Sequence, residues 1–188
     1  YGYVPFQYAN VMVSDLMNLI KDYGFFYIDS HGGVCQARTG EFLTGIWTSQ
    51  PWSTQGDNVY GAELDSARLV YMYARGDSSG TCINQWRYAF TGKLVAKYMT
   101  FSQNSLVYIS ACNSDSPSLR AGFATAGASV FMGWTQPVTA LWSNIAGEFM
   151  VDRMLGSNIY PVFETPKQRP FDITQVYQDL KNRGWDRD

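Results

Sequence analysis

The stretch LVYISACNSD, residues 106–115, decides the fold class of this chain. Its apolar first half is typical of a buried strand, and Ala111 and Cys112 stand where that strand gives way to a polar turn. A second stretch, FFYIDSHGG at residues 25–33, has the same form and brings His31, the chain's only histidine, to the end of its strand. Because parallel strands open onto a cleft at their carboxyl ends, the two stretches predict a thiol and an imidazole at one edge of a sheet.

The rest of the chain alternates helix-like and strand-like segments. Helices are expected where apolar residues recur at helical spacing between capping residues, over 10–24, 116–127, 137–156 and 173–184, with a helical turn at 92–100. Strands are expected in the apolar runs 25–29, 68–74, 86–90, 105–111 and 128–134. Polar and Gly-rich composition predicts loops over 30–42 and 47–58, and prolines predict an extended segment over 160–172. This alternation predicts an α/β fold with a mainly parallel sheet and helices on both faces.

The composition limits the kinds of partner. The chain has 188 residues, 16% of them charged, a net charge of −2 and no long run of basic residues. Binding to a phosphate backbone needs concentrated basic charge, so we expect no nucleic-acid partner. No apolar run approaches the roughly 20 residues of a membrane-spanning helix. The scarcity of charges favours an extracellular or cell-surface protein, and the start at Tyr1 suggests a processed chain or a piece of a larger multidomain protein.

The residues at the two strand ends suit acyl transfer. A thiolate is a strong nucleophile, and a neighbouring imidazole can take the thiol proton and later protonate a leaving amine. Attack on a carbonyl creates an oxyanion, which needs backbone N–H donors nearby. Gly32 and Gly33 follow His31 directly, and Cys112 precedes the expected helix start near Ser116, where the helix dipole is positive. These residues predict a thioester mechanism.

The three cysteines leave two arrangements open. Cys35 and Cys82 could form a disulfide bond, with Cys112 left as a single thiol. Alternatively, all three are buried thiols, because cysteine is among the most buried residue types.

The segments FFYIDSHGG and SLVYISACNSD resemble the His-Gly and Ala-Cys strand ends of the caspase, legumain, gingipain and clostripain clan of cysteine peptidases. The stretch SLRAGFATAGASVFMGWTQPVTALW, residues 118–142, is also similar to the segment after the nucleophile in gingipain-like members. The resemblance covers residues 25–33 and 105–150 well and residues 34–104 poorly.

The resemblance implies a fold, an activity and a site. The fold would be a caspase-like three-layer α/β/α sandwich made by residues 1–188 as a single domain, with an inserted, insertion-rich region at 34–104 between the His and Cys strands. The activity would be that of a cysteine endopeptidase acting on a protein or peptide. Cys112 would be the nucleophile, His31 the acid/base, and the backbone N–H groups of Gly32 and Cys112 the oxyanion hole. The chemistry needs no cofactor, and a structural calcium ion is compatible with the resemblance.

Two departures from the clan support an alternative. Only residues 1–24 precede the His strand, where the clan usually has further strands, and the interval between His31 and Cys112 is longer than usual. The alternative is a catalytically silent caspase-like domain that serves binding or assembly in a larger surface protein.

Two other patterns suggest different chemistry but fit less well. The segment GDSSG, residues 76–80, matches G-x-S-x-G with Ser78 as nucleophile, but the only histidine precedes it, contrary to the order in α/β-hydrolases. His31, Cys35, Cys82 and Cys112 would be a zinc ligand set, but they lack the paired short spacings of structural zinc sites. We therefore expect a turn at Ser78 and no metal site.

Substrate selection is expected to depend on the pocket for the side chain before the scissile bond. An acidic group there would select Arg or Lys, and the candidates in the middle region are Asp57, Glu63, Asp65 and Asp77. Of these we expect Asp65 to contact the substrate, with Trp134 and Trp142 forming an aromatic wall of the pocket. Solvated carboxylates and core tryptophans are the competing interpretations.

Overall fold

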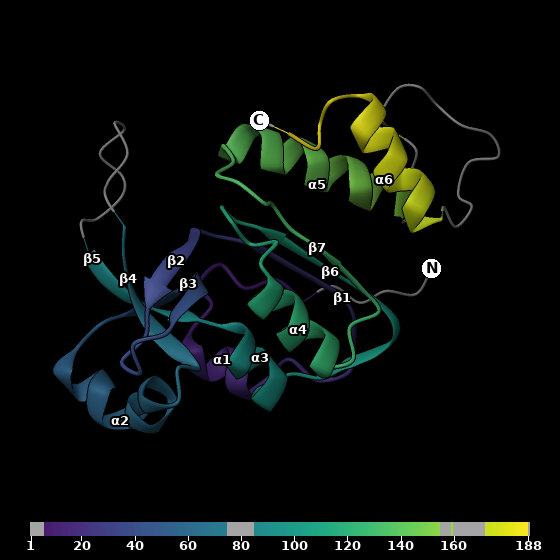
Figure 1. Ribbon diagram of the computed structural model, residues 1–188. Coiled ribbons are helices and arrows are strands. Elements are labelled where there is room, and N and C mark those ends of the chain that lie inside the picture. Colours follow the sequence, from purple (N-terminus) through teal and green to yellow (C-terminus); the bar gives the residue numbers. More distant parts are fainter. Residues whose placement is uncertain (1–5, 75–84, 155–158, 160–171, 188) are drawn as a thin grey trace. The chain divides into compact units, whose positions relative to one another are not determined.

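The computed structural model describes residues 6–74, 85–154, 159 and 172–187 (Figure 1). The chain divides into two compact units, one made of residues 7–136 and the other of the residues before and after that range. The segment GDSSG with Ser78, as well as Asp77, Cys82 and most of the expected extended stretch 160–172, lies outside the described residues.

The first unit contains a parallel sheet of three strands. Its order is β1 (Tyr23–Asp29), β6 (Phe101–Ser110) and β7 (Val130–Met132). In the central strand β6 residues 105–110 are all buried, which matches the apolar run expected there. The expected strands at 25–29, 105–111 and 128–134 are therefore confirmed.

Three helices lie on one face of this sheet (Figure 1): α1 (Val13–Asn18), α3 (Gly92–Tyr98) and α4 (Pro117–Thr125). Their apolar side chains form one core with the sheet, and its fully buried members include Leu16, Leu94, Leu119, Phe123, Val107 and Ile109. The helix predicted to begin after Ser116 is confirmed, because the Ser116 hydroxyl accepts a hydrogen bond from the Leu119 N–H at 3.3 Å.

A second, antiparallel sheet occupies the sequence between β1 and β6. Its order is β2 (Gly32–Gln36), β3 (Phe42–Pro51), β5 (Gln85–Phe90) and β4 (Leu69–Ala74), and helix α2 (Thr54–Asp65) lies between β3 and β4 in sequence. The strands expected at 68–74 and 86–90 are confirmed. The loops expected at 30–42 and 47–58 are wrong, because strand pairing and the cap of α2 organise these polar stretches: the Ser53 hydroxyl accepts from the Gly56 N–H at 2.9 Å.

Two expected helix boundaries also differ. Helix α1 ends at Asn18, and Gly24 lies in β1 rather than at a helix end. Asp22, with φ of 57°, turns the chain before that strand. Helix α5 (Ala140–Met154) begins three residues after Pro137, where we had expected its start.

The second unit contains α5 and α6 (Ile173–Asn182). The Asp172 side chain caps α6 by accepting from the Thr174 N–H at 2.8 Å, so the closing helix is confirmed. In α5 the buried carboxylate of Asp152 pairs with Arg153 at 2.6 Å and accepts from the Ile159 N–H.

The chain is therefore a mixed α/β protein. Its described strands divide between a parallel sheet and a separate antiparallel sheet, instead of forming the one mainly parallel sheet that the sequence suggested. No helix among the described residues is both long and apolar enough to cross a membrane.

Candidate functional site

Strands β1 and β6 bring His31 and Cys112 to the same edge of the parallel sheet. The two strands are neighbours and run in the same direction, with Asp29 opposite Ser110 at their carboxyl ends. The Ser110 hydroxyl donates to the Asp29 carboxylate at 2.8 Å, and the Ser30 N–H donates to the Ser110 carbonyl at 3.0 Å. His31 and Cys112 each follow two residues after this last pair, so the backbone brings both residues just beyond the carboxyl ends of neighbouring strands.

The backbone after β1 then passes directly against Cys112. A Cβ atom placed on Gly32 would lie 2.3 Å from the Cys112 carbonyl oxygen and 3.1 Å from the Cβ of Ala111. Any side chain larger than hydrogen would therefore collide with the backbone that carries the cysteine. The glycine after His31 is a requirement of this close approach.

The turn that carries Cys112 is fixed from two sides. Asn113 adopts a left-handed conformation, φ 55°, and its N–H donates to the Gln136 carbonyl at 3.2 Å. The Ser114 hydroxyl donates to the Ile109 carbonyl at 2.9 Å and accepts from the Trp134 N–H at 3.0 Å. The thiol is half-buried, and Cys112 forms no disulfide bond. The structure therefore holds this cysteine in a defined turn that solvent still reaches.

The side chain of His31 is exposed and lies against one aromatic ring. The imidazole meets the Trp47 indole edge to face, with 4.9 Å between ring centroids and 82° between ring planes. The main chains are also joined, because the Trp47 N–H donates to the His31 carbonyl at 2.9 Å. Trp47 lies in the stretch that the sequence analysis assigned to a loop, so this contact was missed.

The strand pairing decides where the Gly32 N–H points. In antiparallel strands, hydrogen-bonded pairs alternate with non-hydrogen-bonded pairs. The bond between Trp47 and His31 makes theirs a hydrogen-bonded pair, so Gly32 and its partner Ile46 form the other kind. The Gly32 N–H therefore points away from β3, toward the outer edge of β2, which is the first strand of its sheet. The Gly32 N–H is therefore not used in pairing with β3, which is one condition for an oxyanion-hole donor.

The predicted substrate-binding residues lie in different surroundings. Trp134 is buried beside the Cys112 turn, and its indole N–H donates to the Tyr108 hydroxyl at 3.2 Å. Asp65 ends α2 and pairs with Arg38 at 3.2 Å. Trp142 belongs to α5 in the other compact unit. Only Trp134 is joined to the Cys112 turn by contacts within one unit.

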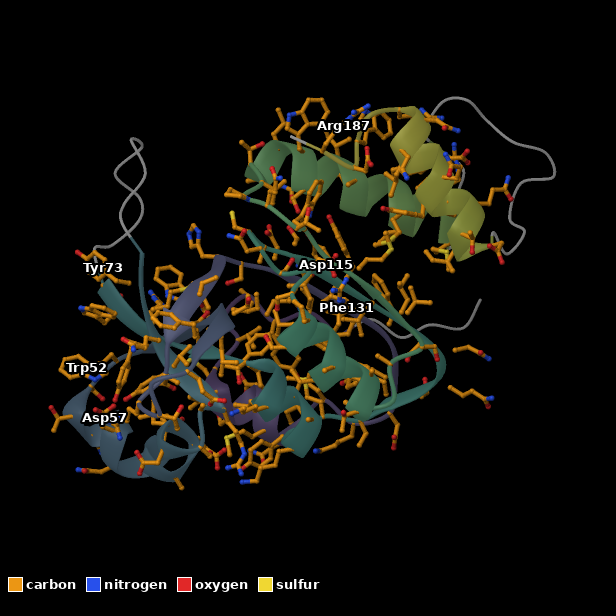
Figure 2. The ribbon with its side chains drawn as sticks, in the orientation of Figure 1. Trp52, Asp57, Tyr73, Asp115, Phe131 and Arg187 are labelled. Atoms are coloured by element: carbon orange, nitrogen blue, oxygen red, sulfur yellow. The ribbon has the colours of Figure 1, made fainter. Side chains whose placement is uncertain are left out.

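The remaining carboxylates of the middle region hold α2 in place. The Asp57 carboxylate accepts from the hydroxyls of Tyr88 at 2.7 Å and Tyr71 at 2.9 Å, and pairs with Arg38 at 3.1 Å. Burial opposes ionisation of Asp57, but these hydrogen bonds outweigh it and lower the pKa of the carboxyl. Figure 2 shows Asp57 and Trp52 beside α2, apart from Asp115 in the segment after Cys112.

Glu63 is the most enclosed of these carboxylates. It accepts from the Tyr98 hydroxyl at 2.6 Å and pairs with Lys97 and Arg68, each at 3.1 Å. Burial raises the pKa of Glu63, but the three donors together outweigh it, so the pKa lies below the ordinary value of 4.5. Glu63 thus joins α2 to α3 rather than lining the His31–Cys112 edge.

Replacing Glu63 by glutamine should lower the free energy of unfolding by about 1–2 kcal/mol at pH 7, because two cations lose their carboxylate partner. A folded pKa below the unfolded one stabilises the fold above pH 4.5, and this contribution is lost as the pH falls through the folded pKa. The difference between wild type and Glu63→Gln, measured by urea unfolding, should therefore shrink at acidic pH. Glu41→Gln, which removes an exposed pair with Lys93, is the control and should change little. A difference that does not vary with pH would contradict this interpretation.

The two described cysteines differ in their surroundings. Cys35 forms no disulfide bond, so the possible pairing with Cys82 is not found, and Cys82 itself lies outside the described residues. Burial raises the pKa of the Cys35 thiol, although a hydrogen bond with the Gly45 backbone partly opposes this effect. Among the residues that the structure describes, no three His, Cys, Asp or Glu side chains gather in a group that could hold a metal ion.

Comparison with known proteins adds no relative. No protein-family model matches the chain, no curated protein matches it, and no solved structure matches it. The functional argument therefore rests on the residues and the geometry described above.

Proposed function

We propose that this protein is a cysteine endopeptidase in which Cys112 and His31 act as a pair at the carboxyl edge of the parallel sheet. The observation that carries the proposal is the register of β1 and β6, which ends both strands side by side immediately before the two residues. A nucleophile and its base must lie within hydrogen-bond reach during catalysis, and neighbouring parallel strands supply that proximity without a long loop.

The proposed reaction proceeds through a thioester. His31 accepts the Cys112 thiol proton, and the sulfur attacks the peptide carbonyl carbon to give a tetrahedral oxyanion. The protonated imidazole then donates its proton to the leaving amine, the C–N bond breaks, and the acyl group remains on Cys112. In the second half, His31 removes a proton from water and the water oxygen attacks the thioester carbonyl carbon. The C–S bond then breaks, the imidazolium returns its proton to the Cys112 sulfur, and the peptide leaves with a new carboxyl group.

The N–H groups of Gly32 and Cys112 are the proposed oxyanion donors. Two observations support this role. The Gly32 N–H points away from β3, and the Gly32 backbone lies so close to Cys112 that a Cβ placed on Gly32 would be 2.3 Å from the Cys112 carbonyl oxygen. Donors fixed in the backbone stabilise developing charge without reorganising during the reaction.

A caspase-like three-layer sandwich is the fold we propose around this site. Helices α1, α3 and α4 supply one covering layer of the parallel sheet. Strands β2 to β5 with α2 occupy the interval between His31 and Cys112 where an inserted segment was expected. A protein or peptide substrate and an extracellular or cell-surface location remain part of the proposal, as do contacts of Trp134 and Asp65 with substrate.

A peptidyl acyloxymethyl ketone tests the proposal directly. This reagent should modify Cys112 much faster than Cys35, whose buried thiol has a raised pKa and hence little thiolate at neutral pH. Peptide mapping by mass spectrometry after short exposure identifies the modified residue, and Cys35→Ala is the control that should leave the labelling rate unchanged. Slow and equal labelling of the cysteines would favour the catalytically silent domain instead.

A further inference from the structure

His31 lies in the short exposed segment between β1 and β2, so the orientation of its imidazole depends on contacts with other residues. His31 follows β1 by two residues and directly precedes β2, and its side chain is exposed. The imidazole makes an edge-to-face contact with the Trp47 indole, with 4.9 Å between ring centroids and 82° between ring planes. Such contacts restrict ring rotation because the positive ring edge prefers the negative face of its neighbour.

Two contacts hold the Trp47 side chain in place. Its indole N–H donates to the Met72 carbonyl at 3.2 Å, which sets the plane of the ring. The Arg87 guanidinium lies 5.2 Å from the ring centroid, within the range of a cation–π contact. Arg87 is in turn anchored by hydrogen bonds to the Ser49 carbonyl at 2.6 Å and the Gln85 side chain at 3.2 Å. The indole is therefore a well-supported wall for the imidazole.

The same tryptophan also fixes the backbone that carries His31. Its N–H donates to the His31 carbonyl at 2.9 Å, and its carbonyl accepts from the Ser30 hydroxyl at 3.0 Å. Main chain and side chain of Trp47 thus both act on residues 30–31. Trp47 therefore fixes both the backbone position of His31 and the orientation of its imidazole ring.

We infer that Trp47 is the positioning residue for His31, holding the imidazole in one orientation at the strand end beside Cys112, and that Arg87 holds the indole against it. The inference rests on the proposed function, because it assigns the orientation a role in proton transfer. Transfer between sulfur and nitrogen requires hydrogen-bond geometry, so rotation of the ring away from Cys112 costs rate without removing any reacting group.

The test compares Trp47→Phe with Trp47→Leu, which both keep an apolar side chain while only the first keeps an aromatic ring. Trp86→Ala is the matched control, because Trp86 is an exposed tryptophan of the same sheet that contacts Tyr73 instead. We expect Trp47→Leu to lower kcat for a peptide substrate about tenfold with little change in KM, and Trp47→Phe to retain most of the activity. Trp86→Ala should behave as wild type.

A second measurement does not depend on activity. His31 is the only histidine, so a histidine-labelled sample gives one set of imidazole signals by NMR. These signals should shift and show rotational averaging in Trp47→Leu, but not in Trp86→Ala. Unchanged signals and kcat in Trp47→Leu, or equal losses in the Phe and Leu variants, would overturn the inference. Failure of the proposed function looks different, because His31→Ala would then leave the reactivity of Cys112 unchanged while the NMR signals still respond to Trp47.

Discussion

Replacing Cys112 by alanine should abolish peptide hydrolysis, and replacing His31 by alanine should lower kcat/KM by about 10²–10⁴-fold. The first change removes the atom that forms the thioester. The second leaves the thiol in place but removes the group that takes its proton and protonates the leaving amine. Initial rates with a fluorogenic peptide, measured on folded protein of matched circular dichroism, provide the comparison.

The control for both changes is Cys35→Ala. Cys35 lies in β2, close to Gly45 in the antiparallel sheet, and takes no part in the proposed chemistry. Its replacement should leave kcat/KM near the wild-type value. Activity that survives in Cys112→Ala, or that is lost equally in Cys35→Ala, would contradict the assignment of the nucleophile.

Replacing Gly32 by alanine should reduce kcat/KM by about 100-fold, because the new methyl group would lie 2.3 Å from the Cys112 carbonyl oxygen. The carbonyl oxygen is a backbone atom and the position of the new methyl group is set by the backbone, so the two strand ends must move apart. We also expect a loss of about 1–3 kcal/mol in the free energy of unfolding, which is typical of an overpacked site. Kinetics and urea unfolding of the same sample measure the two effects.

Gly33→Ala is the matched control for this change. Among the described residues, a Cβ on Gly33 would meet only the terminal methyl of Met72, at 3.1 Å, and that flexible side chain can move aside. It should therefore cost much less activity and stability than Gly32→Ala. If the two alanine variants behaved alike, the close approach of Gly32 to Cys112 would not govern the site.

The parts of the fold that the sequence predicts well are those with strong local signals. Strand β1 and the second half of β6 are mostly apolar runs, and α4 begins with a serine cap followed by Pro117. These patterns depend on neighbours in sequence, so their structure follows from local chemistry. The placement of His31 and Cys112 at one edge follows from the same strands.

Strands β2 and β3 of the antiparallel sheet were missed because their signals are non-local. Strand β2 begins with two glycines, which are poor strand formers, and it exists because β3 pairs with it along its whole length. Gly45 in β3 is required because a side chain there would lie 2.8 Å from a Val70 methyl group on another strand. Neither relationship is visible in a short window of sequence.

Trp47 was missed for the same reason. Its contact with His31 depends on the register between β2 and β3, which places residues 31 and 47 opposite each other. Helix α2 was also missed, since its polar sequence lacks a clear apolar stripe and its position depends on the ties of Asp57 and Glu63 to other elements. The sequence thus predicts the reacting groups better than the residues that support them.

We propose that His31 and Cys112 face one another at the edge shared by β1 and β6. The most direct test is cross-linking with 1,3-dibromoacetone, in which the Cys112 sulfur displaces one bromide and an imidazole nitrogen displaces the other. We expect a single intramolecular bridge between Cys112 and the chain's only histidine, identified by mass spectrometry of the digested protein. Cys112 that carries only a singly reacted reagent, with His31 unmodified, would contradict it.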